Sequence, residues 1–124
     1  MDDHWRVAHA FGTRLPGWLV VVPRRHVIAL DESTDSELVS LGPLLGSLTS
    51  ALRTVVGCEK TYVALFAEAK GYEHVHIHVV PRMAWFEREH RGPRSLDAFL
   101  GATGDAVPDE EMDRVALAIR SAMA

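Results

Sequence analysis

The sequence predicts an α+β domain with an antiparallel sheet of about five strands and two helices. Three observations lead to this fold class: short apolar runs separated by turn residues, a long helical pattern behind a capping box, and a second helical pattern near the C-terminal end. Because most of these elements are joined by short turns, an antiparallel arrangement is favoured. The 124 residues are expected to form a single domain over 1–124.

The predicted strands are short apolar runs bounded by turn residues or proline. The run that ends at Pro23 is continuous, which is typical of a buried strand, and a short strand is expected to continue beyond that proline. The histidine-containing run is expected to end at Pro81. In chain order the predicted strands cover residues 4–11, 18–22, 27–30, 59–68 and 74–80.

Two helices follow from capping signals and from apolar residues at helical spacing. Thr34 and Glu37 form a capping box ahead of a leucine-rich pattern that should end at Gly57. Pro43 lies inside this pattern and predicts a kink or a restart of the helix. Pro108 and the acidic residues after it open the second helix, whose apolar stripe is Met112, Val115, Ile119 and Met123.

The composition excludes several classes of function. A formal net charge of −4 argues against a general nucleic-acid-binding protein. The single cysteine, Cys58, excludes an internal disulfide and a zinc cluster built from cysteines. The acidic start of the chain, with no apolar stretch, predicts neither a secretory signal nor a membrane partner, and a cytoplasmic location is the expectation.

Three histidines alternate along one predicted strand, in the run His74-Val75-His76-Ile77-His78-Val79-Val80. Since residues i, i+2 and i+4 of a strand point to one face, these three are expected to form a histidine row with neighbours about 6.6–7 Å apart. The residues between them are β-branched and suit a packed core. One face is therefore committed to the core, and the other face must be a site or a surface.

Three interpretations fit the histidine row. It could be a plain solvated surface, or a zinc site to which His26 adds a ligand. It could also carry out nucleophilic catalysis at phosphorus, because neutral imidazole with a pKa near 6.5 is available at neutral pH. Attack on an α-phosphorus would give a nucleotidyl-imidazole that water then opens. Three of the seven histidines on alternate positions favour this last interpretation.

The run HVHIHVV resembles the His-x-His-x-His-x-x signature of the histidine-triad (HIT) superfamily, with a hydrophobic residue at every x. The Pro81-Arg82 pair that follows resembles the continuation of this signature in the branch that hydrolyses dinucleoside polyphosphates, such as diadenosine tetraphosphate. Residues 16–27, PGWLVVVPRRHV, are similar to the family's strand that ends in proline, two basic residues and histidine. The resemblance covers roughly residues 4–86 and implies a HIT-like fold and a homodimer that needs no metal or other cofactor.

The resemblance also implies roles for individual residues. His76, the middle histidine, would be the nucleophile, His78 would contact the phosphate or the leaving group, and His74 would support the site. His26 matches a recurrent family histidine near the row, which acts either directly or as a supporting residue.

Three departures from the family pattern affect substrate binding. Trp18 stands where many members carry a histidine; it could stack on a base or simply belong to the core. Ala10 stands near a position where many members hold the ribose with Asp or Asn. The loop before the row lacks the family's Gly-Gln or Gly-Ser, and Lys70 or the Gly71 amide could hold the phosphate instead.

The predicted function is therefore a nucleotidyl hydrolase acting at the α-phosphate of a dinucleoside polyphosphate or a nucleoside phosphoramidate. A small-molecule nucleotide is the expected ligand, and no nucleic-acid partner is expected. Two alternatives stay open: a nucleotidyl transferase, and a nucleotide-binding or sensing protein with little turnover.

Overall fold

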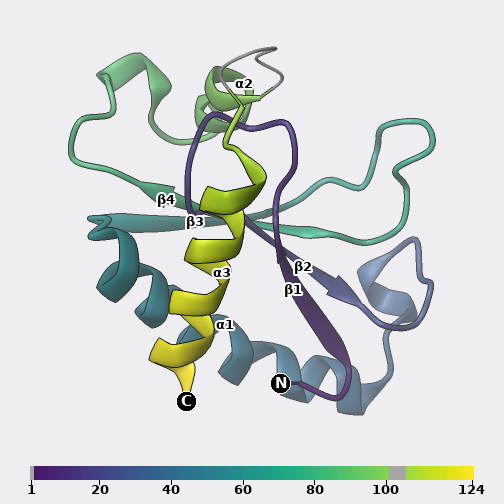
Figure 1. The fold of residues 1–124 in the computed structure, drawn as a ribbon. Coiled ribbons are helices and arrows are strands. Elements are labelled where there is room, and N and C mark those ends of the chain that lie inside the picture. Colours follow the sequence, from purple (N-terminus) through teal and green to yellow (C-terminus); the bar gives the residue numbers. More distant parts are fainter. Residues whose placement is uncertain (1, 101–105) are drawn as a thin grey trace.

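A four-stranded antiparallel sheet organises the computed structural model, which describes residues 2–100 and 106–124 (Figure 1). Its strands lie in the order β1-β2-β4-β3, so β1 and β3 form the two edges. The bounds are Trp5–His9 for β1, Leu19–Pro23 for β2, Lys60–Leu65 for β3 and Ile77–Arg82 for β4. The predicted fold class is confirmed, with four strands in the described residues instead of about five.

The missing strand is the one predicted over residues 27–30. This segment follows Pro23 as an extended loop and leads into a short 3-10 turn, η1 (Leu30–Glu32). The Val27 carbonyl accepts one hydrogen bond from the Val75 amide. The segment thus lies against the start of the histidine run without forming a ladder, and the prediction of a strand there is wrong.

Helix α1 (Asp35–Val56) begins and ends where the sequence predicts. Thr34 Oγ1 accepts from the Glu37 amide while the Glu37 carboxylate accepts from the Thr34 amide, and Gly57 closes the helix with φ of 72°. The helix continues through Pro43 without a break, so no second helix begins there. By length and composition alone α1 is long and apolar enough to span a membrane, and 17% of its most apolar stretch is buried. Its residues Leu48, Ala51 and Leu52 pack in the core.

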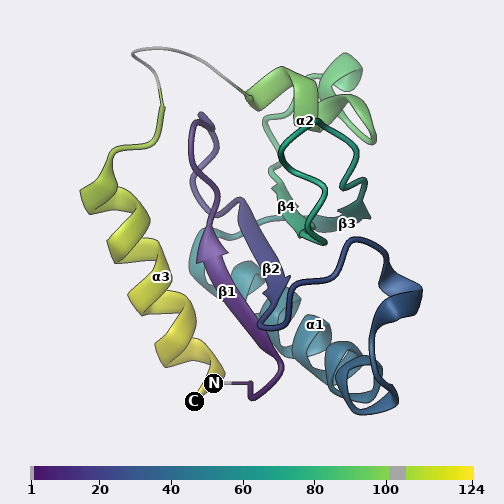
Figure 2. The ribbon, with the colours of Figure 1, turned by 90° about the vertical axis from the view of Figure 1, so that its right-hand side faces the viewer.

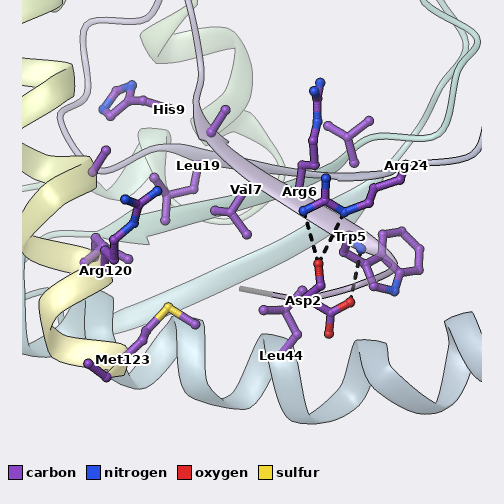
Figure 3. Close-up of a pocket in the computed structure, with 15 residues that line it drawn as sticks. Asp2, Trp5, Arg6, Val7, His9, Leu19, Arg24, Leu44, Arg120 and Met123 are labelled. Carbon is purple, nitrogen blue, oxygen red and sulfur yellow. Dashed lines mark hydrogen bonds between the residues drawn. The ribbon is translucent and has the colours of Figure 1, made fainter.

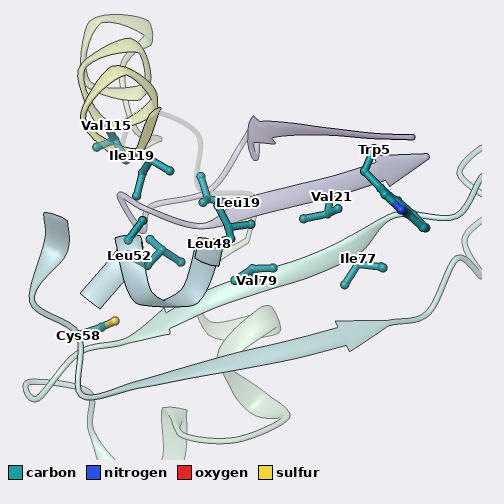
Figure 4. Packing of buried hydrophobic residues seen from close by; sticks show 11 residues of the cluster. Trp5, Leu19, Val21, Leu48, Leu52, Cys58, Ile77, Val79, Val115 and Ile119 are labelled. Atoms are coloured by element: carbon teal, nitrogen blue, oxygen red, sulfur yellow. The ribbon is translucent and has the colours of Figure 1, made fainter. Parts of the chain in front are cut away.

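The main core lies between one face of the sheet and two helices, α1 and α3 (Asp109–Met123). Figure 2 shows α3 running beside β1 while α1 passes beneath the sheet. Leu19 and Val21 of β2 pair with Val79 and Ile77 of β4, so all four point to this face. Figure 4 shows them meeting Leu48 and Leu52 of α1 and Val115 and Ile119 of α3.

The predicted stripe of α3 is confirmed in three of its four positions. Met112, Val115 and Ile119 are buried, whereas Met123 is 36% exposed at the end of the helix. Between β4 and α3 lie two short helical elements: a 3-10 turn, η2 (Arg88–His90), and the helix α2 (Arg94–Phe99). Residues 101–105 lie outside the described part of the chain.

A second, smaller core covers part of the opposite face of the sheet. Its members come from the loop before β2, from β4 and from the segment that carries α2: Leu15, Trp18, Val80, Phe86 and Phe99. Pro81 lies inside β4 instead of ending it, because β2 pairs with β4 only as far as Val79. Beyond that point β4 has one strand neighbour, where a residue without an amide donor is tolerated.

Candidate active site at the histidine row

The histidine row lies at the start of β4, on the sheet face opposite α1. Val75, Ile77 and Val79 are buried while the three histidines are half-buried, which confirms the predicted alternation. His78 belongs to the paired strand, whereas His74 and His76 precede it. His78 pairs with Val20 on β2 and Ala64 on β3. Neither neighbour is charged, and both have short side chains.

The backbone fixes the orientation of the His76 ring. Its Nδ1 lies 2.9 Å from the carbonyl oxygen of His74. Because a carbonyl oxygen only accepts, Nδ1 carries the hydrogen in the bonded ring. The lone pair of neutral His76 therefore lies on Nε2, the atom farther from the backbone. This is the tautomer that a nucleophilic imidazole needs.

His78 lies beside His76, and its Nδ1 accepts a hydrogen bond where that of His76 donates one. The two rings lie edge to face with their centroids 5.0 Å apart. The indole N–H of Trp18 donates to Nδ1 of His78 at 3.1 Å, so Nδ1 is the acceptor in this ring. Burial, followed by repulsion from positive charge on His76, lowers the pKa of His78 to about 4. His78 is consequently neutral at neutral pH.

Trp18 belongs to the second core and not to a binding surface. Its side chain is fully buried, so neither face of the indole is open to a nucleobase. The predicted role as a stacking platform is wrong, and the core alternative is correct. No local pattern predicts the contact between Trp18 and His78, because the two residues are 60 positions apart and meet through the pairing of β2 with β4.

His26 packs directly on the histidine row. Its ring is stacked on that of His74 with centroids 4.8 Å apart and planes 8° from parallel. The Nδ1 atom of His74 is buried and has no hydrogen-bond partner within the described structure. His26 therefore contacts the residue whose carbonyl orients His76, which fits the supporting role among the two that were expected.

His9 is a buried histidine that the sequence analysis did not single out. Its Nδ1 contacts the Ala10 carbonyl at 2.9 Å and its Nε2 accepts from the Gly17 amide at 2.9 Å. Burial lowers its pKa. The ring thus ties the end of β1 to the turn that delivers Trp18, and nothing in the spacing of His9 from the histidine row predicts this contact.

Lys70 and Gly71 lie in the exposed turn that precedes the row. The Gly71 amide donates to the carboxylate of Glu73, at 2.9 Å to one oxygen and 3.1 Å to the other. An anion could use this amide only after displacing Glu73, so the Gly71 amide is not a preformed phosphate donor in this structure. Lys70 is exposed, and none of the salt bridges of the described residues involves it.

Most of the cations beside the predicted site segments already have partners. Arg24 donates to the carbonyl of Asp2, Arg25 to the carboxylate of Glu37, and Arg82 to the carboxylate of Glu59. The Arg25 contact also holds the pKa of Glu37 well below its usual range, at about 2. These arginines therefore stabilise the frame of the site.

Two cavities border the row and β1. A cavity of about 420 Å³ lies against the His26–His74 stack, with Arg6, Val22 and Arg24 among its walls. A larger one, of about 840 Å³, lies between β1, α1 and α3; Figure 3 shows Arg6, Arg24 and Arg120 among apolar side chains there. The histidines His76 and His78 line neither cavity.

Zinc binding was the metal alternative for the row. Within residues 2–100 and 106–124, the group whose donor atoms come close enough to share one ion is Glu87, Glu89 and His90, which lies outside the row. The row and His26 do not form such a group in this part of the chain. Its rings are instead arranged by hydrogen bonding and stacking, as described above.

Known structures share this architecture, although the sequence matches no family model and no curated protein. A histidine triad protein from Sinorhizobium meliloti superposes with a TM-score of 0.79 at 22% identity, over 98% of this chain and 84% of that one. A histidine triad protein from Bradyrhizobium japonicum gives 0.75 at 18% identity, over 100% and 87%.

A more distant similarity links the chain to an enzyme. The diadenosine triphosphate hydrolase of Plasmodium falciparum, solved in complex with cyclomarin A, superposes with a TM-score of 0.68 at 12% identity. The match covers 98% of this chain and 72% of that one. Similarity at these identities establishes the fold. The chain therefore has the fold of the histidine-triad proteins.

Proposed function

We propose that this chain is a nucleotidyl hydrolase that acts at the α-phosphate of a nucleoside 5′-phosphate derivative, through a covalent nucleotidyl-histidine on His76. The observation that carries the proposal is the hydrogen bond from His76 Nδ1–H to the His74 carbonyl at 2.9 Å. It leaves the Nε2 lone pair as the reactive group of a ring whose orientation is fixed.

The same hydrogen bond supports the intermediate. When Nε2 forms its bond to phosphorus, the ring acquires positive charge while Nδ1 keeps its hydrogen. The His74 carbonyl then accepts a charge-assisted hydrogen bond, which is stronger than the neutral one present before attack. Stabilisation that grows along the reaction accelerates it. His74 thus acts through its backbone, and His26 holds its ring in place.

His78 is proposed to contact the phosphate or the leaving group. It lies next to His76 on the same sheet face, and it is neutral at neutral pH, so it neither repels nor competes with the attacking ring. The proposed substrate is a dinucleoside polyphosphate or a nucleoside phosphoramidate. The structural similarity to a diadenosine triphosphate hydrolase supports a nucleotide ligand.

Lys70 stays a proposed phosphate contact, because it lies on the exposed turn before the row and no salt-bridge partner is found for it in the described residues. A homodimer is also proposed, on the resemblance to the family. The unpaired edge strand β3 supports it, since Val63 is 49% exposed and Phe66 just beyond the strand is 60% exposed.

The decisive experiment compares His76→Ala with wild type on a panel of dinucleoside polyphosphates and nucleoside phosphoramidates. We expect turnover to fall by at least about 10³-fold while the fold, followed by circular dichroism, is retained. His90→Ala, a histidine outside the row, is the matched control and should keep wild-type turnover. Release of nucleoside monophosphate by His76→Ala at the wild-type rate would contradict the proposal.

Brief exposure to substrate followed by acid quench tests the intermediate directly. A nucleotidyl adduct on the peptide that contains His76 is the expected product. Ligand binding without adduct or turnover would point to the nucleotide-sensing alternative instead. If the adduct forms but nucleoside monophosphate appears only when phosphate or a sugar phosphate is withheld, the protein is a transferase.

A further inference from the structure

The Nδ1 atom of His78 has a hydrogen-bond partner that determines which ring nitrogen carries the hydrogen. Trp18 donates its indole N–H to Nδ1 at 3.1 Å, and the two rings lie edge to face at 67° with centroids 5.6 Å apart. The donor is fully buried and cannot be replaced by water without opening the second core. An indole N–H only donates, so Nδ1 of His78 must be unprotonated wherever this bond exists.

The neighbours of His78 provide nothing that would reverse this state. Its partners on β2 and β3 are Val20 and Ala64, which do not ionise. The titratable group that acts on it is His76, whose positive charge disfavours a second one nearby. His78 is thus held as neutral imidazole with its hydrogen on Nε2, the reverse of His76, whose hydrogen is on Nδ1.

The position of Trp18 is itself over-determined. The Ala10 amide donates to the Trp18 carbonyl at 2.9 Å, and the Gly17 amide just before it donates to His9. A side chain at Gly17 would meet Val56 at 3.1 Å and Pro81 at 3.3 Å, so the turn packs closely against α1 and β4. The indole is delivered to His78 by a rigid piece of backbone.

We propose that Trp18 is a positioning residue that holds His78 as a neutral Nε2–H donor, and that the site thereby selects phosphoanhydride over phosphoramidate bonds. This inference rests on the proposed function and decides between its two substrate classes. His78 can give a hydrogen bond to the leaving group, but it has no proton to spare for transfer.

The two bonds differ in what their cleavage requires. In an anhydride, the Nε2 lone pair of His76 forms the N–P bond, and the P–O electron pair leaves with a phosphate oxygen whose pKa is about 6, so it departs as a stable anion. In a phosphoramidate of an alkylamine, the P–N pair leaves with nitrogen, and the amine, with a pKa near 10.4 like that of lysine, must take a proton to depart. Water then attacks phosphorus, the N–P pair returns to Nε2, and the proton released goes to solvent.

The wild-type protein provides the first test, without substrate. Long-range ¹H–¹⁵N NMR spectra of the histidine rings distinguish the two tautomers and follow each titration. We expect the His78 spectrum to show hydrogen on Nε2 and an unprotonated Nδ1 from pH 5 to 8. Hydrogen on Nδ1, or a cationic ring at pH 6, would overturn the proposal whether or not the protein is a hydrolase.

Two tryptophan variants test the consequence for specificity. Trp18→Phe removes the N–H donor, while Trp5→Phe is the control, because Trp5 is also fully buried and its indole donates to the Glu37 carbonyl in the main core, on the other face of the sheet from the row. The ratio of kcat/KM for a dinucleoside polyphosphate to that for an alkyl phosphoramidate of the same nucleoside is measured at pH 6. We expect Trp18→Phe to lower this ratio at least about five-fold, and to raise the pKa of His78 in the same spectra.

The outcomes separate the inference from the proposed function. An unchanged ratio in Trp18→Phe, or an equal fall in Trp5→Phe, overturns the specificity proposal while leaving hydrolysis at His76 standing. Wild-type protein that turns over neither substrate overturns the proposed function and with it the specificity. The tautomer of His78 in the first test then still decides whether Trp18 positions that ring.

Discussion

The imidazole rings of His26 and His74 are stacked, with their planes 8° from parallel and their centroids 4.8 Å apart. His74 in turn offers its carbonyl oxygen to Nδ1 of His76. The stack therefore fixes the side chain of the residue whose backbone orients the His76 ring. If His76 is the nucleophile proposed above, His26 acts on the reaction through His74, and its nitrogen atoms are not needed for that effect.

Replacement of His26 separates a supporting ring from a reacting one. His26→Ala should lower kcat by about 2–10-fold, the value of one aromatic contact, with KM nearly unchanged. His26→Phe keeps a ring that can stack and should recover most of the loss. Steady-state kinetics of both variants on one substrate are the measurement. A His26→Phe enzyme as impaired as His26→Ala would show that a nitrogen of His26 takes part directly.

The carboxylate of Glu73 accepts from the Gly71 amide, one of the two groups expected to hold a phosphate. Because its carboxylate accepts from the Gly71 amide, Glu73→Ala should free that donor and remove a negative charge near the start of the row. We expect KM for an anionic substrate to fall about three-fold at low salt, and less at high salt as the charge effect is screened. Glu68→Ala, on the same exposed loop, is the control for charge alone. An equal fall in both variants would remove any special role for the Gly71 amide.

Lys70 is the cation that the same turn leaves exposed. Lys70→Ala should raise KM by about three-fold, with a dependence on ionic strength that marks a screened charge. Lys60→Ala, on the exposed start of β3, provides a lysine control. Kinetic constants that do not change in Lys70→Ala would rule out a phosphate contact there.

How far the sequence could predict the site is clear from particular residues. The alternation of His74, His76 and His78 with buried residues is a local property of extended backbone, so spacing was sufficient to predict it. The capping box at Thr34 is local in the same sense. The Trp18–His78 hydrogen bond depends on how β2 pairs with β4, and no local pattern encodes that register.

The errors in the fold prediction have a similar origin. Val27 is β-branched, as is typical of strands, yet its backbone pairs with the histidine run through a single hydrogen bond from the Val75 amide. Pro81 is typical of a strand end, but it is tolerated inside β4 because β2 pairs with β4 only as far as Val79. The short helix α2 was missed because its six residues are stabilised by the burial of Phe99 in the second core and not by helical periodicity.

Gly17 should be far more sensitive to substitution than other glycines with left-handed backbone. Its φ is 92°, and an added Cβ would meet side-chain atoms of α1 and β4 at 3.1–3.4 Å. Gly57, with φ of 72° and nothing within 4 Å, is the matched control. Gly57→Ala should cost about 1 kcal/mol of unfolding free energy, and Gly17→Ala at least about twice that.

Denaturant unfolding of the two glycine variants is the measurement, together with turnover. Gly17→Ala should also lower activity, because the displaced turn carries Trp18 away from His78. Equal destabilisation by the two substitutions would mean that the turn at Gly17 can relax without strain.

The stability of the protein should fall on mild acidification because two histidines are held neutral by the fold. The pKa of His78 is about 4 and that of His9 is lowered, against 6.5 for an unfolded chain. Between pH 4 and pH 6.5 the unfolded state binds more protons than the folded state, so the free energy of unfolding rises with pH. The contribution of the neutral histidines to stability is fully present only above pH 6.5. Between pH 6.5 and 4.5 the carboxylates contribute little, since the lowered pKa of Glu37 matters only below its unfolded value of 4.5.

Thermal unfolding at pH 7 and pH 5 measures this dependence. We expect the Tm of wild type to drop by about 5 °C, allowing for screening of half-buried rings by solvent. His78→Asn should be less stable at pH 7 but should lose less on acidification, because one of the two neutral rings is gone. His90→Asn, a histidine outside this arrangement, should keep the wild-type difference between the two pH values. A His78→Asn protein with the full wild-type drop would show that His78 ionises as readily in the folded chain as in the unfolded one, and that the indole of Trp18 does not hold it neutral.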